Sequence, residues 1–321
     1  MIIEDKVYGK IKINEPVLLE LIKCPSILRL KTISQYGVPD RYYHIKNYSR
    51  FEHSVGVMII LRKLGASLEE QIAGLLHDVS VLAFSHIADW VFAEGDKGVE
   101  DLHDTLHRDF ISKTEVPKIL KKYNFLLERV LNEDNFSLLE TKIPNLCADR
   151  VDYSLREFKY WLNAKIVGRC LRNLANFNGE MVFTDQRVAY LFATNFLKLQ
   201  MNHWGGYEAM IRYYLFSNVL KVGLKKKIIL KEDFFKEEKL ILEKIERSQN
   251  KEIKDTLILL TRKDLKGIKV GSGNRRVRKK FRYVDPKVIL KGQLVCLSEI
   301  DPSFRAIIDK SRKISEEGLL I

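Results

Sequence analysis

The sequence lacks long apolar runs, paired cysteines and a leader pattern, and each absence excludes a class of protein. Apolar stretches such as VGVMII at 55–60 are far shorter than the roughly 18 residues that a membrane helix needs. The cysteines at 24, 147, 170 and 296 are scattered, so neither a zinc knuckle nor a disulfide framework is expected. The opening MIIEDKVYGK has no basic, apolar and small-residue succession typical of a secretory signal. We therefore expect no membrane contact and a reducing, cytoplasmic location.

What is present is a basic, globular composition. The 321 residues are 46% hydrophobic and 30% charged, which is typical of a chain that buries a sizeable core. Lys and Arg number 55 against 42 Asp and Glu, a formal charge of +13. Such an excess favours anionic partners, namely nucleotides, nucleic acid or an acidic surface, but charge alone does not rank them.

Apolar residues recur at helical spacing over most of the chain. A short hairpin is expected within 1–13 and a polar, aromatic loop at 40–49. Helices are predicted at 15–33, 50–65, 67–80, 86–92, 100–111, 116–131, 143–162, 186–220, 230–248 and 302–314. The second long helix opens with Ser67 as N-cap and Glu70 after it, which is the capping-box spacing.

The character changes towards the C-terminus. Residues 271–301 are basic, alternating and punctuated by glycine, which predicts a pair of strands with a turn at Asp285–Pro286. The fold class predicted is mainly α, with a small mixed α/β C-terminal portion. The predicted domains are a core at 1–220 and a C-terminal helical and β-hairpin subdomain at 221–321.

Histidines gather in one part of the chain, between residues 44 and 107. His53 lies early in a predicted helix, and His77 and Asp78 follow the apolar run at 72–76. Adjacent residues on a helix point about 100° apart, so this pair can flank one ion. A carboxylate at a helix C-terminus is disfavoured by the dipole unless a cation compensates. The stretch therefore suggests a metal.

A further ligand is sought on the predicted helix NLCADRVDYSLRE. Asp149, Tyr153 and Glu157 are spaced four apart and share one face, with Arg150 beside them. That face either lines a polar cavity or is an ordinary solvated surface with ion pairs. This helix alone leaves both interpretations open.

In chain order, His53, His77–Asp78 and Asp149 form an H…HD…D pattern that resembles the HD-domain metal-dependent phosphohydrolases. The stretches SRFEHSVGVM, LLHDVSVLAFSHIADWVF and ADRVDYSLRE are similar to the three motifs of the deoxynucleoside-triphosphate triphosphohydrolase branch. The resemblance covers about residues 5–215 and implies the HD-domain helical fold. It also implies that the chain hydrolyses (deoxy)nucleoside triphosphates to nucleoside and triphosphate, and that it forms a homo-oligomer.

The resemblance assigns roles by position. It implies that His53, His77, Asp78 and Asp149 bind one divalent ion, and mixed imidazole and carboxylate ligands suit Mn, Fe, Co, Ni, Zn or Mg. The residues implied to contact substrate are Arg50 and Arg150 at the phosphates, Tyr153 and Glu157 at the nucleotide end, and Tyr207, for which core packing is the alternative.

Proton transfer is implied for a second group of residues. His103 falls where the family keeps the histidine that protonates the leaving oxygen, and Asp89 is placed to orient it. His86 and Asp89 lie one turn apart and can form a hydrogen-bonded pair. Imidazole suits this task because its pKa is close to neutral.

One position departs from the family pattern. The family usually has a histidine that contacts phosphate where this chain has Val81. The departure leaves the metal ligands in place but removes one polar contact to the substrate.

The second hypothesis concerns the basic stretch Arg275–Arg282, in which Phe281 is interleaved and Tyr283 follows. It can bind nucleic acid, as in a nucleic-acid-binding protein, or an HD nuclease or phosphodiesterase, whose HD site is weakened or altered. A solvated strand pair with a charged edge is the structural alternative.

Overall fold

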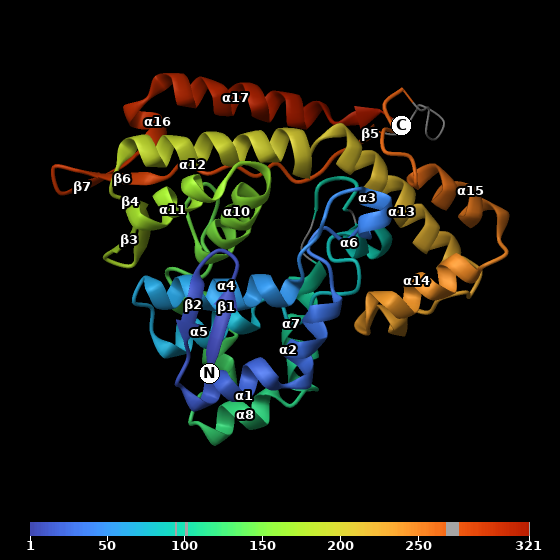
Figure 1. The fold of residues 1–321 in the computed structure, drawn as a ribbon, viewed down its shortest axis with the longest axis horizontal. Coiled ribbons are helices and arrows are strands. Elements are labelled where there is room, and N and C mark those ends of the chain that lie inside the picture. The colour runs from blue at the N-terminus through green and yellow to red at the C-terminus, as the bar shows by residue number, and fades with distance from the viewer. Residues whose placement is uncertain (94, 100–101, 268–275, 321) are drawn as a thin grey trace.

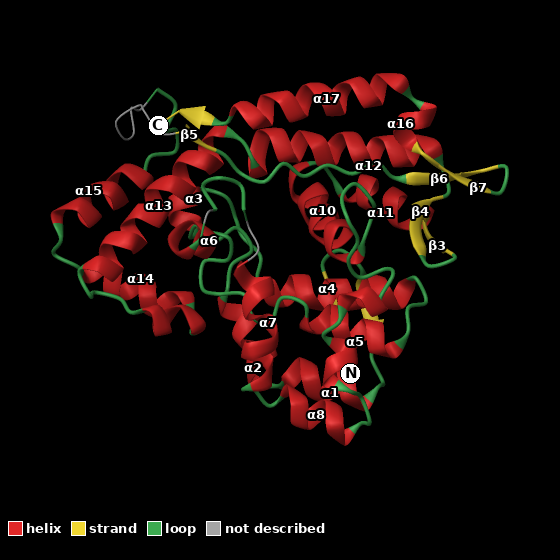
Figure 2. Cartoon of the chain, turned by 180° about the vertical axis from the view of Figure 1, so that it is seen from behind, coloured by secondary structure: helices red, strands yellow, loops and turns green. Residues whose placement is uncertain are grey.

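Helices dominate the molecule, as Figure 1 and, from behind, Figure 2 show. The computed structural model describes residues 1–93, 95–99, 102–267 and 276–320, and the side chain of His103 lies outside that description. The prediction of a mainly α fold with a small mixed sheet is confirmed. Among the described residues, every helix is too short or too polar to cross a membrane.

The N-terminal part begins with the predicted hairpin. Strands β1 (Ile2–Asp5) and β2 (Gly9–Lys12) pair antiparallel, with Ile2 opposite Lys12. The short helices of this part of the chain are α1 (Pro16–Lys23), α2 (Pro25–Arg29), α3 (Asp40–Tyr43), α7 (Leu102–Ser112), α8 (Val116–Lys122) and α9 (Leu127–Val130). The segment predicted as a loop at 40–49 therefore includes one helical turn, α3.

Helices α4 (Arg50–Lys63), α5 (Leu68–Leu76) and α10 (Ala148–Trp161) carry or flank the polar residues of the H…HD…D pattern. Helix α4 starts at Ser49, whose hydroxyl accepts from the Glu52 amide while the Glu52 carboxylate accepts from the Ser49 amide. Helix α5 starts at Ser67 as predicted, and α10 packs against α4. Helix α4 is buried along most of its length, so its polar side chains must find partners inside the protein.

The remaining helices form the other half of the molecule. They are α6 (Ile87–Phe92), α11 (Ala164–Asn173), α12 (Gln186–Leu199), α13 (Tyr207–Lys225), α14 (Glu238–Arg247), α15 (Lys251–Leu260), α16 (Leu297–Ile300) and α17 (Pro302–Glu317). Figure 1 shows α17 running along α12, and the two helices contact each other. The helix predicted at 186–220 is interrupted by a π-helical turn at Gln200–Trp204. The domain boundary predicted at residue 220 falls inside α13.

The C-terminal strands join a sheet that begins much earlier in the chain. Strands β3 (Leu174–Phe177), β4 (Glu180–Phe183), β6 (Lys287–Leu290) and β7 (Gln293–Cys296) pair in that order, and β4–β6 is parallel. Strands β5 (Arg276–Val277) and β8 (Leu319–Leu320) form a separate antiparallel pair. The turn predicted at Asp285–Pro286 is wrong: these residues precede β6, and Lys291 and Gly292, both at positive φ, form the turn.

The apolar stretch VSVLAFS between His77 and His86 is explained by packing. Val81, Leu82, Ala83 and Phe84 are each at most 5% exposed and belong to a core cluster with residues of α6, α13, α14 and α15. A second cluster packs around α4, α5, α10 and α12. The polar residues at the two ends of the stretch therefore lie at the boundary of two cores.

Candidate active site

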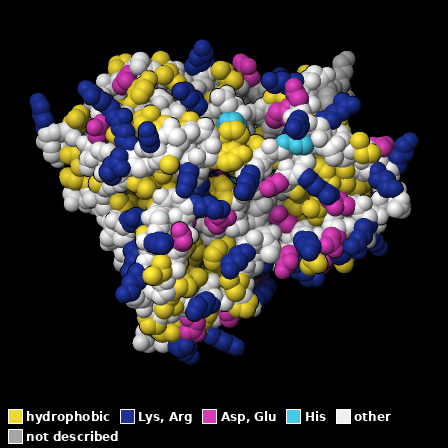
Figure 3. Space-filling view, viewed as in Figure 1, with side chains coloured by type: hydrophobic (Ala, Val, Ile, Leu, Met, Phe, Trp, Pro, Cys, Tyr) yellow, Lys and Arg dark blue, Asp and Glu magenta, His cyan; other side chains and the backbone are white. Residues whose placement is uncertain are grey.

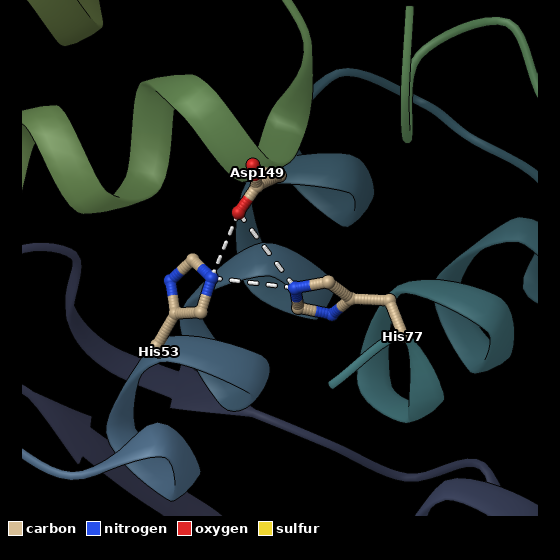
Figure 4. Close-up of side chains that lie close together, drawn as sticks. All are labelled: His53, His77 and Asp149. Atoms are coloured by element: carbon tan, nitrogen blue, oxygen red, sulfur yellow. Dashed lines mark hydrogen bonds and ion pairs between the residues drawn. The ribbon is translucent and has the colours of Figure 1, made fainter. Parts of the chain in front are cut away.

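His53, His77 and Asp149 converge from three different elements (Figure 4). His53 comes from α4, His77 follows α5, and Asp149 lies in the first turn of α10. The Nε2 atom of His53 lies 2.9 Å from Asp149 Oδ1 and 3.3 Å from His77 Nε2. His77 Nε2 lies 3.7 Å from the same Asp149 oxygen. The donor atoms lie within 4.8 Å of one another, and so can share one ion.

Asp78 lies at the edge of this group. Its Oδ2 is 3.6 Å from Nε2 of both His53 and His77, and it accepts from Arg50 Nη1 at 2.7 Å. Arg50 and Asp78 are at most 5% exposed, so this ion pair is shielded from water. A carboxylate just after a helix C-terminus requires a nearby cation, because the helix dipole disfavours negative charge there. Arg50 supplies this cation, at least in part.

The Nδ1 atom of each imidazole, on the side away from the shared site, also has a hydrogen-bond partner. His53 Nδ1 lies 2.8 Å from Asp152 Oδ2, and His77 Nδ1 lies 2.8 Å from the Gly74 carbonyl oxygen. A proton on each Nδ1 donates to these acceptors and leaves Nε2 as the lone-pair donor that faces the shared site. Such outer contacts are typical of metal-binding histidines.

Asp152 is a site residue that the sequence analysis missed. It is fully buried and accepts from Arg156 Nε at 2.8 Å and from the Tyr8 hydroxyl at 2.8 Å. Arg156 also donates to Asp5 Oδ2 at 2.8 Å. A chain of buried charges therefore runs from the N-terminal hairpin to His53. The available signal was the four-residue spacing of Asp152 and Arg156, which favours an ion pair on a helix.

The local electrostatics favour positive charge at the site. Burial lowers the pKa of His77, but Asp78 and Asp149 outweigh it and raise that pKa to about 10. Burial likewise opposes protonation of His53, yet the hydrogen bonds to Asp149 and Asp152 raise its pKa. The same negative field that holds protons on these rings attracts a divalent cation.

The donor set fits a divalent transition metal. Two imidazole nitrogens and carboxylate oxygens are ligands that Mn, Fe, Co, Ni and Zn accept. Their outer contacts to Asp152 and Gly74 already orient the rings. The residues present therefore match the chemistry of an HD-type metal centre.

A neighbouring acidic group is neutralised by the protein itself. Glu140, Cys147 and Asp149 also lie close enough to share an ion. However, Arg150 donates to Glu140 Oε1 at 2.6 Å and lies 3.0 Å from the Cys147 sulfur. Because the guanidinium supplies the positive charge there, this group is an ion-pair cluster beside the metal site.

The site opens into a cavity of about 340 Å³. Of the predicted metal ligands, His77, Asp78 and Asp149 line it, as do Arg50 and Arg150. Of the two interpretations left open for this face of α10, the structure shows the cavity wall, because Tyr153 and Glu157 line the same space. The aromatic lining residues are Tyr36, Tyr43, Tyr48, Tyr153, Trp204 and Tyr213.

The predicted proton-transfer residues are only partly described. His86 lines the cavity, and its Nδ1 lies 3.2 Å from Asp89 Oδ2. Asp89 Oδ1 accepts from the Leu102 amide at 3.0 Å, which ties it to the start of α7. The side chain of His103 lies outside the described residues. Val81 is 3% exposed and borders a small cavity of about 10 Å³ together with Arg50, His86 and Asp89.

Two other predicted sites lie in different surroundings. The Tyr207 hydroxyl donates to the Leu265 carbonyl at 3.3 Å, and Tyr207 packs against the core cluster that contains Val81 and Phe84. In the basic stretch, Arg275 is outside the described residues. Lys279, Lys280 and Arg282 line the cavity, which the sequence analysis did not predict.

Comparisons with known proteins agree with this geometry. Residues 50–153 match the family model described as "HD domain". The whole chain is 34% identical over 328 residues to the uncharacterized protein YdhJ of Bacillus subtilis (strain 168), covering 100% of this chain and 98% of that one. A crystal structure of a hypothetical protein from Aquifex aeolicus has the same fold, with a TM-score of 0.67 at 18% identity over 98% of this chain and 99% of that one.

Named relatives match over part of their length. The metal-dependent phosphohydrolase cns2 of Cordyceps militaris is 38% identical over 157 residues, 49% of this chain and 45% of that protein. The deoxynucleoside triphosphate triphosphohydrolase SAMHD1 of Gallus gallus is 29% identical over 147 residues, 40% of this chain and 24% of that protein. This chain belongs to the HD-domain superfamily of metal-dependent phosphohydrolases.

Proposed function

We propose that the protein hydrolyses (deoxy)nucleoside triphosphates to nucleoside and triphosphate. The observation that carries the proposal is one cavity that combines the His77–Asp78–Asp149 edge of the metal site with an aromatic lining. The edge of the metal site suits a phosphate, and the aromatic lining suits a nucleoside. The names of the partial relatives cns2 and SAMHD1 support the same reaction class.

In this proposal His53, His77, Asp78 and Asp149 hold one divalent ion, of which Mn, Fe, Co, Ni, Zn and Mg are the candidates. A bound ion of this kind acidifies water and polarises a phosphoryl oxygen. The protein's own contribution is to fix the ligands, through Asp152 behind His53 and the Gly74 carbonyl behind His77.

Arg50 and Arg150 steady the phosphates. Both guanidiniums are already paired, with Asp78 and Glu140 respectively, so they are held in place before substrate arrives. Arg50 Nη2 is buried and has no hydrogen-bond partner among the described residues. This N–H group is the one that a phosphate oxygen would satisfy.

The chemical step breaks the bond between the α-phosphorus and the 5′ oxygen. Water adds to phosphorus, and the departing oxygen takes a proton from an imidazole. His103 and His86 are the candidates, and Asp89 is the carboxylate that orients the donor, because it lies 3.2 Å from His86 Nδ1. A histidine that a carboxylate orients in this way is placed to act as a general acid.

The nucleoside end is received by Tyr153 and Glu157. Burial raises the pKa of Glu157 to about 7, and this carboxyl accepts from Trp161 Nε1 at 2.9 Å. Near neutral pH it can therefore either donate or accept a hydrogen bond, which suits recognition of a sugar or base edge.

The test is product release from a panel of dNTPs and NTPs with Mn, Mg, Co and Ni. We expect nucleoside and triphosphate from the wild type, and a loss of at least roughly a hundredfold in H77A and D149A, because each removes a proposed ligand. The matched control is D309A, which removes an exposed carboxylate on α17. Unchanged activity in D149A would overturn the proposal.

The second candidate, nucleic-acid binding or cleavage, is favoured by the distribution of Lys and Arg side chains. Figure 3 shows Lys and Arg side chains distributed over the drawn face, and the C-terminal part of the chain adds cations to the cavity itself. This function predicts oligonucleotide binding that weakens steeply with added salt, without metal-dependent release of nucleoside from free nucleotides.

Homo-oligomerisation and a cytoplasmic location are also part of the proposed function. Light scattering tests the first, and cell fractionation tests the second.

A further inference from the structure

A segment from the C-terminal part of the chain crosses the catalytic cavity. We call residues 276–284 the strap. One end is held where β5 pairs with β8 and where the Arg278 amide donates to the Asp96 carbonyl at 2.8 Å. At the other end Val284 is buried, and the next residue, Asp285, donates its amide to the Pro144 carbonyl at 2.9 Å. The strap is thus fixed on both sides of the cavity.

The middle of the strap is also attached to the body of the protein. Gln200, in the π-helical turn, donates to the Lys280 carbonyl at 3.2 Å. The Phe281 and Tyr283 rings stack at 5.6 Å, and Arg312 of α17 lies over Tyr283 at 4.9 Å. These contacts hold the backbone, so the basic side chains between them have defined positions.

Those basic side chains face the cavity. Lys279, Lys280 and Arg282 are all part of its lining. The Lys279 ammonium lies 3.6 Å from the centre of the Tyr213 ring, another lining residue. A cation–π contact of this kind helps to keep an ammonium in place.

Arg282 lines the same cavity as Asp149 and Tyr153. The Tyr153 ring lies 6.4 Å from the His53 ring. The strap therefore brings positive charge to the region of the metal ligands.

The cavity needs these cations if its substrate is a polyphosphate. Arg50 and Arg150 are engaged with Asp78 and Glu140, and Asp149 and Glu157 add further carboxyl groups to the lining. A triphosphate chain carries roughly four negative charges, which such an acidic lining would repel without additional cations.

We propose that Lys279, Lys280 and Arg282 form a phosphate-binding wall that selects substrates with a polyphosphate chain over monophosphates. This inference rests on the proposed function, because it names which part of the substrate the strap receives. It also gives the basic stretch a role inside the catalytic cavity. The strap then determines specificity, whereas the metal ligands carry the chemistry.

The experiment measures binding of inorganic tripolyphosphate and of orthophosphate to the full chain by calorimetry, with and without excess Mg. The variants are K279Q, K280Q, R282Q and the triple variant. We expect tripolyphosphate affinity to fall roughly five- to tenfold for each cation removed, the size expected for a charge-assisted contact. Orthophosphate affinity should change less than about threefold, since it is too small to span the wall.

Controls separate charge from folding. K310Q removes an exposed lysine on α17 and should bind tripolyphosphate as the wild type does. The charge-preserving variants K279R and K280R should retain binding, which a merely structural role of the lysines would not require. Equal tripolyphosphate affinity in the triple variant and the wild type would overturn the inference, as would an equal loss in K310Q.

The same variants distinguish this inference from the proposed function. Strap-dependent tripolyphosphate binding without hydrolysis of any nucleotide would retain the wall and refute the reaction. Hydrolysis with an unchanged KM for triphosphates in the triple variant would retain the reaction and refute the wall. Tighter, strap-dependent binding of a single-stranded oligonucleotide than of tripolyphosphate would overturn the wall in favour of a nucleic-acid surface.

Discussion

At the scale of single residues, the site depends on charges that are buried in a connected series. Asp5, Arg156, Asp152 and His53 are each within hydrogen-bond distance of the next. Removing one member of such a series leaves its neighbour as an uncompensated buried charge, which is costly. The residues behind His53 should therefore matter nearly as much as the ligands themselves.

The first prediction at this scale concerns Asp152. D152N keeps the shape of the side chain but removes the negative charge behind His53, so the Nδ1 proton is held less firmly. We expect affinity for Mn or Co to fall roughly 10- to 100-fold, the usual effect of losing an outer-shell carboxylate. Calorimetric titration of the metal-free chain measures it, with D309N as the control. Equal affinities in D152N and wild type would contradict the assigned role.

The second prediction concerns the close approach of α4 and α10. A Cβ atom at Gly56 would lie 2.0 Å from Asp152 Oδ1 and 2.1 Å from Arg156 Nη2. G56A must therefore displace this buried ion pair, and we expect it to reduce the free energy of unfolding by about 3 kcal/mol or more. Urea denaturation measures the change.

The matched control is G168A, on α11, where an added Cβ would meet only the flexible end of Arg172. Alanine is the better helix former there, so this variant should be slightly more stable than the wild type. A similar loss in both glycine variants would show that helix propensity, and not the buried pair, governs the effect.

The positions of the proposed ligands follow from motif order, but the residues that support them could not be predicted. The sequence places His53, His77, Asp78 and Asp149 in a familiar order, and α10 does present Tyr153 and Glu157 to the cavity. Asp152 escaped prediction because a carboxylate on a helix is usually solvated, and only tertiary packing buries this one. Asp5 contributes from a hairpin 151 residues away from Arg156, a distance that no local pattern encodes.

At the scale of elements, the segment between α5 and α6 has an uncommon backbone conformation. Phe84 and Ser85 have φ values of 67° and 47°, a left-handed conformation that non-glycine residues rarely adopt. The Glu238 carboxylate of α14 accepts from the Phe84 amide at 2.9 Å and from the Ser34 amide at 2.9 Å. One carboxylate thus holds two loops beside the site.

This carboxylate gives a pH-dependent prediction. Burial raises the pKa of Glu238 to about 7, above its ordinary value near 4.5. Between about pH 4.5 and pH 7, Glu238 keeps its proton in the folded state but loses it in the unfolded state. The contribution of Glu238 to the free energy of unfolding therefore falls as pH rises through this range, and it is constant above about pH 7. E238Q should match the wild type near pH 5 and melt several degrees higher at pH 8. The same difference in melting temperature between E238Q and the wild type at every pH would refute this.

Local signals explain which elements were predicted. Ser67 with Glu70 marked the start of α5, and that start is confirmed. Ser49 and Glu52 form the same kind of cap at the start of α4, a signal that the sequence analysis did not use. The β3–β4 hairpin was missed although Asn178–Gly179, a strong hairpin signal, forms its turn. Its partner β6 lies more than a hundred residues later, and pairing at that separation depends on the whole fold.

At the scale of the whole molecule, the C-terminal residues share a core with the N-terminal ones. Val288, Leu297, Phe304 and Ile308 belong to the same buried cluster as residues of α4, α5 and α12. We propose that residues 1–220 and 221–321, separable by composition, unfold together because this core joins them.

Phe304 tests that proposal. It is fully buried, and its ring lies 6.0 Å from that of Tyr190 on α12. F304A should cost about 3–5 kcal/mol, the range for deleting a buried aromatic ring, and should shift one cooperative transition as a whole. Calorimetry distinguishes this from the alternative, in which a separate C-terminal transition moves and the main one stays.

The position of the strap late in the chain has a consequence for biosynthesis. Every proposed metal ligand has been synthesised by residue 149, whereas the cations that wall the cavity are made only after residue 276, and β6 follows them. Because synthesis runs from the N-terminus, the ligands are made well before the residues that complete the shared core and the cavity wall. On the proposed roles, a nascent chain would lack selectivity for polyphosphates until translation passes the strap.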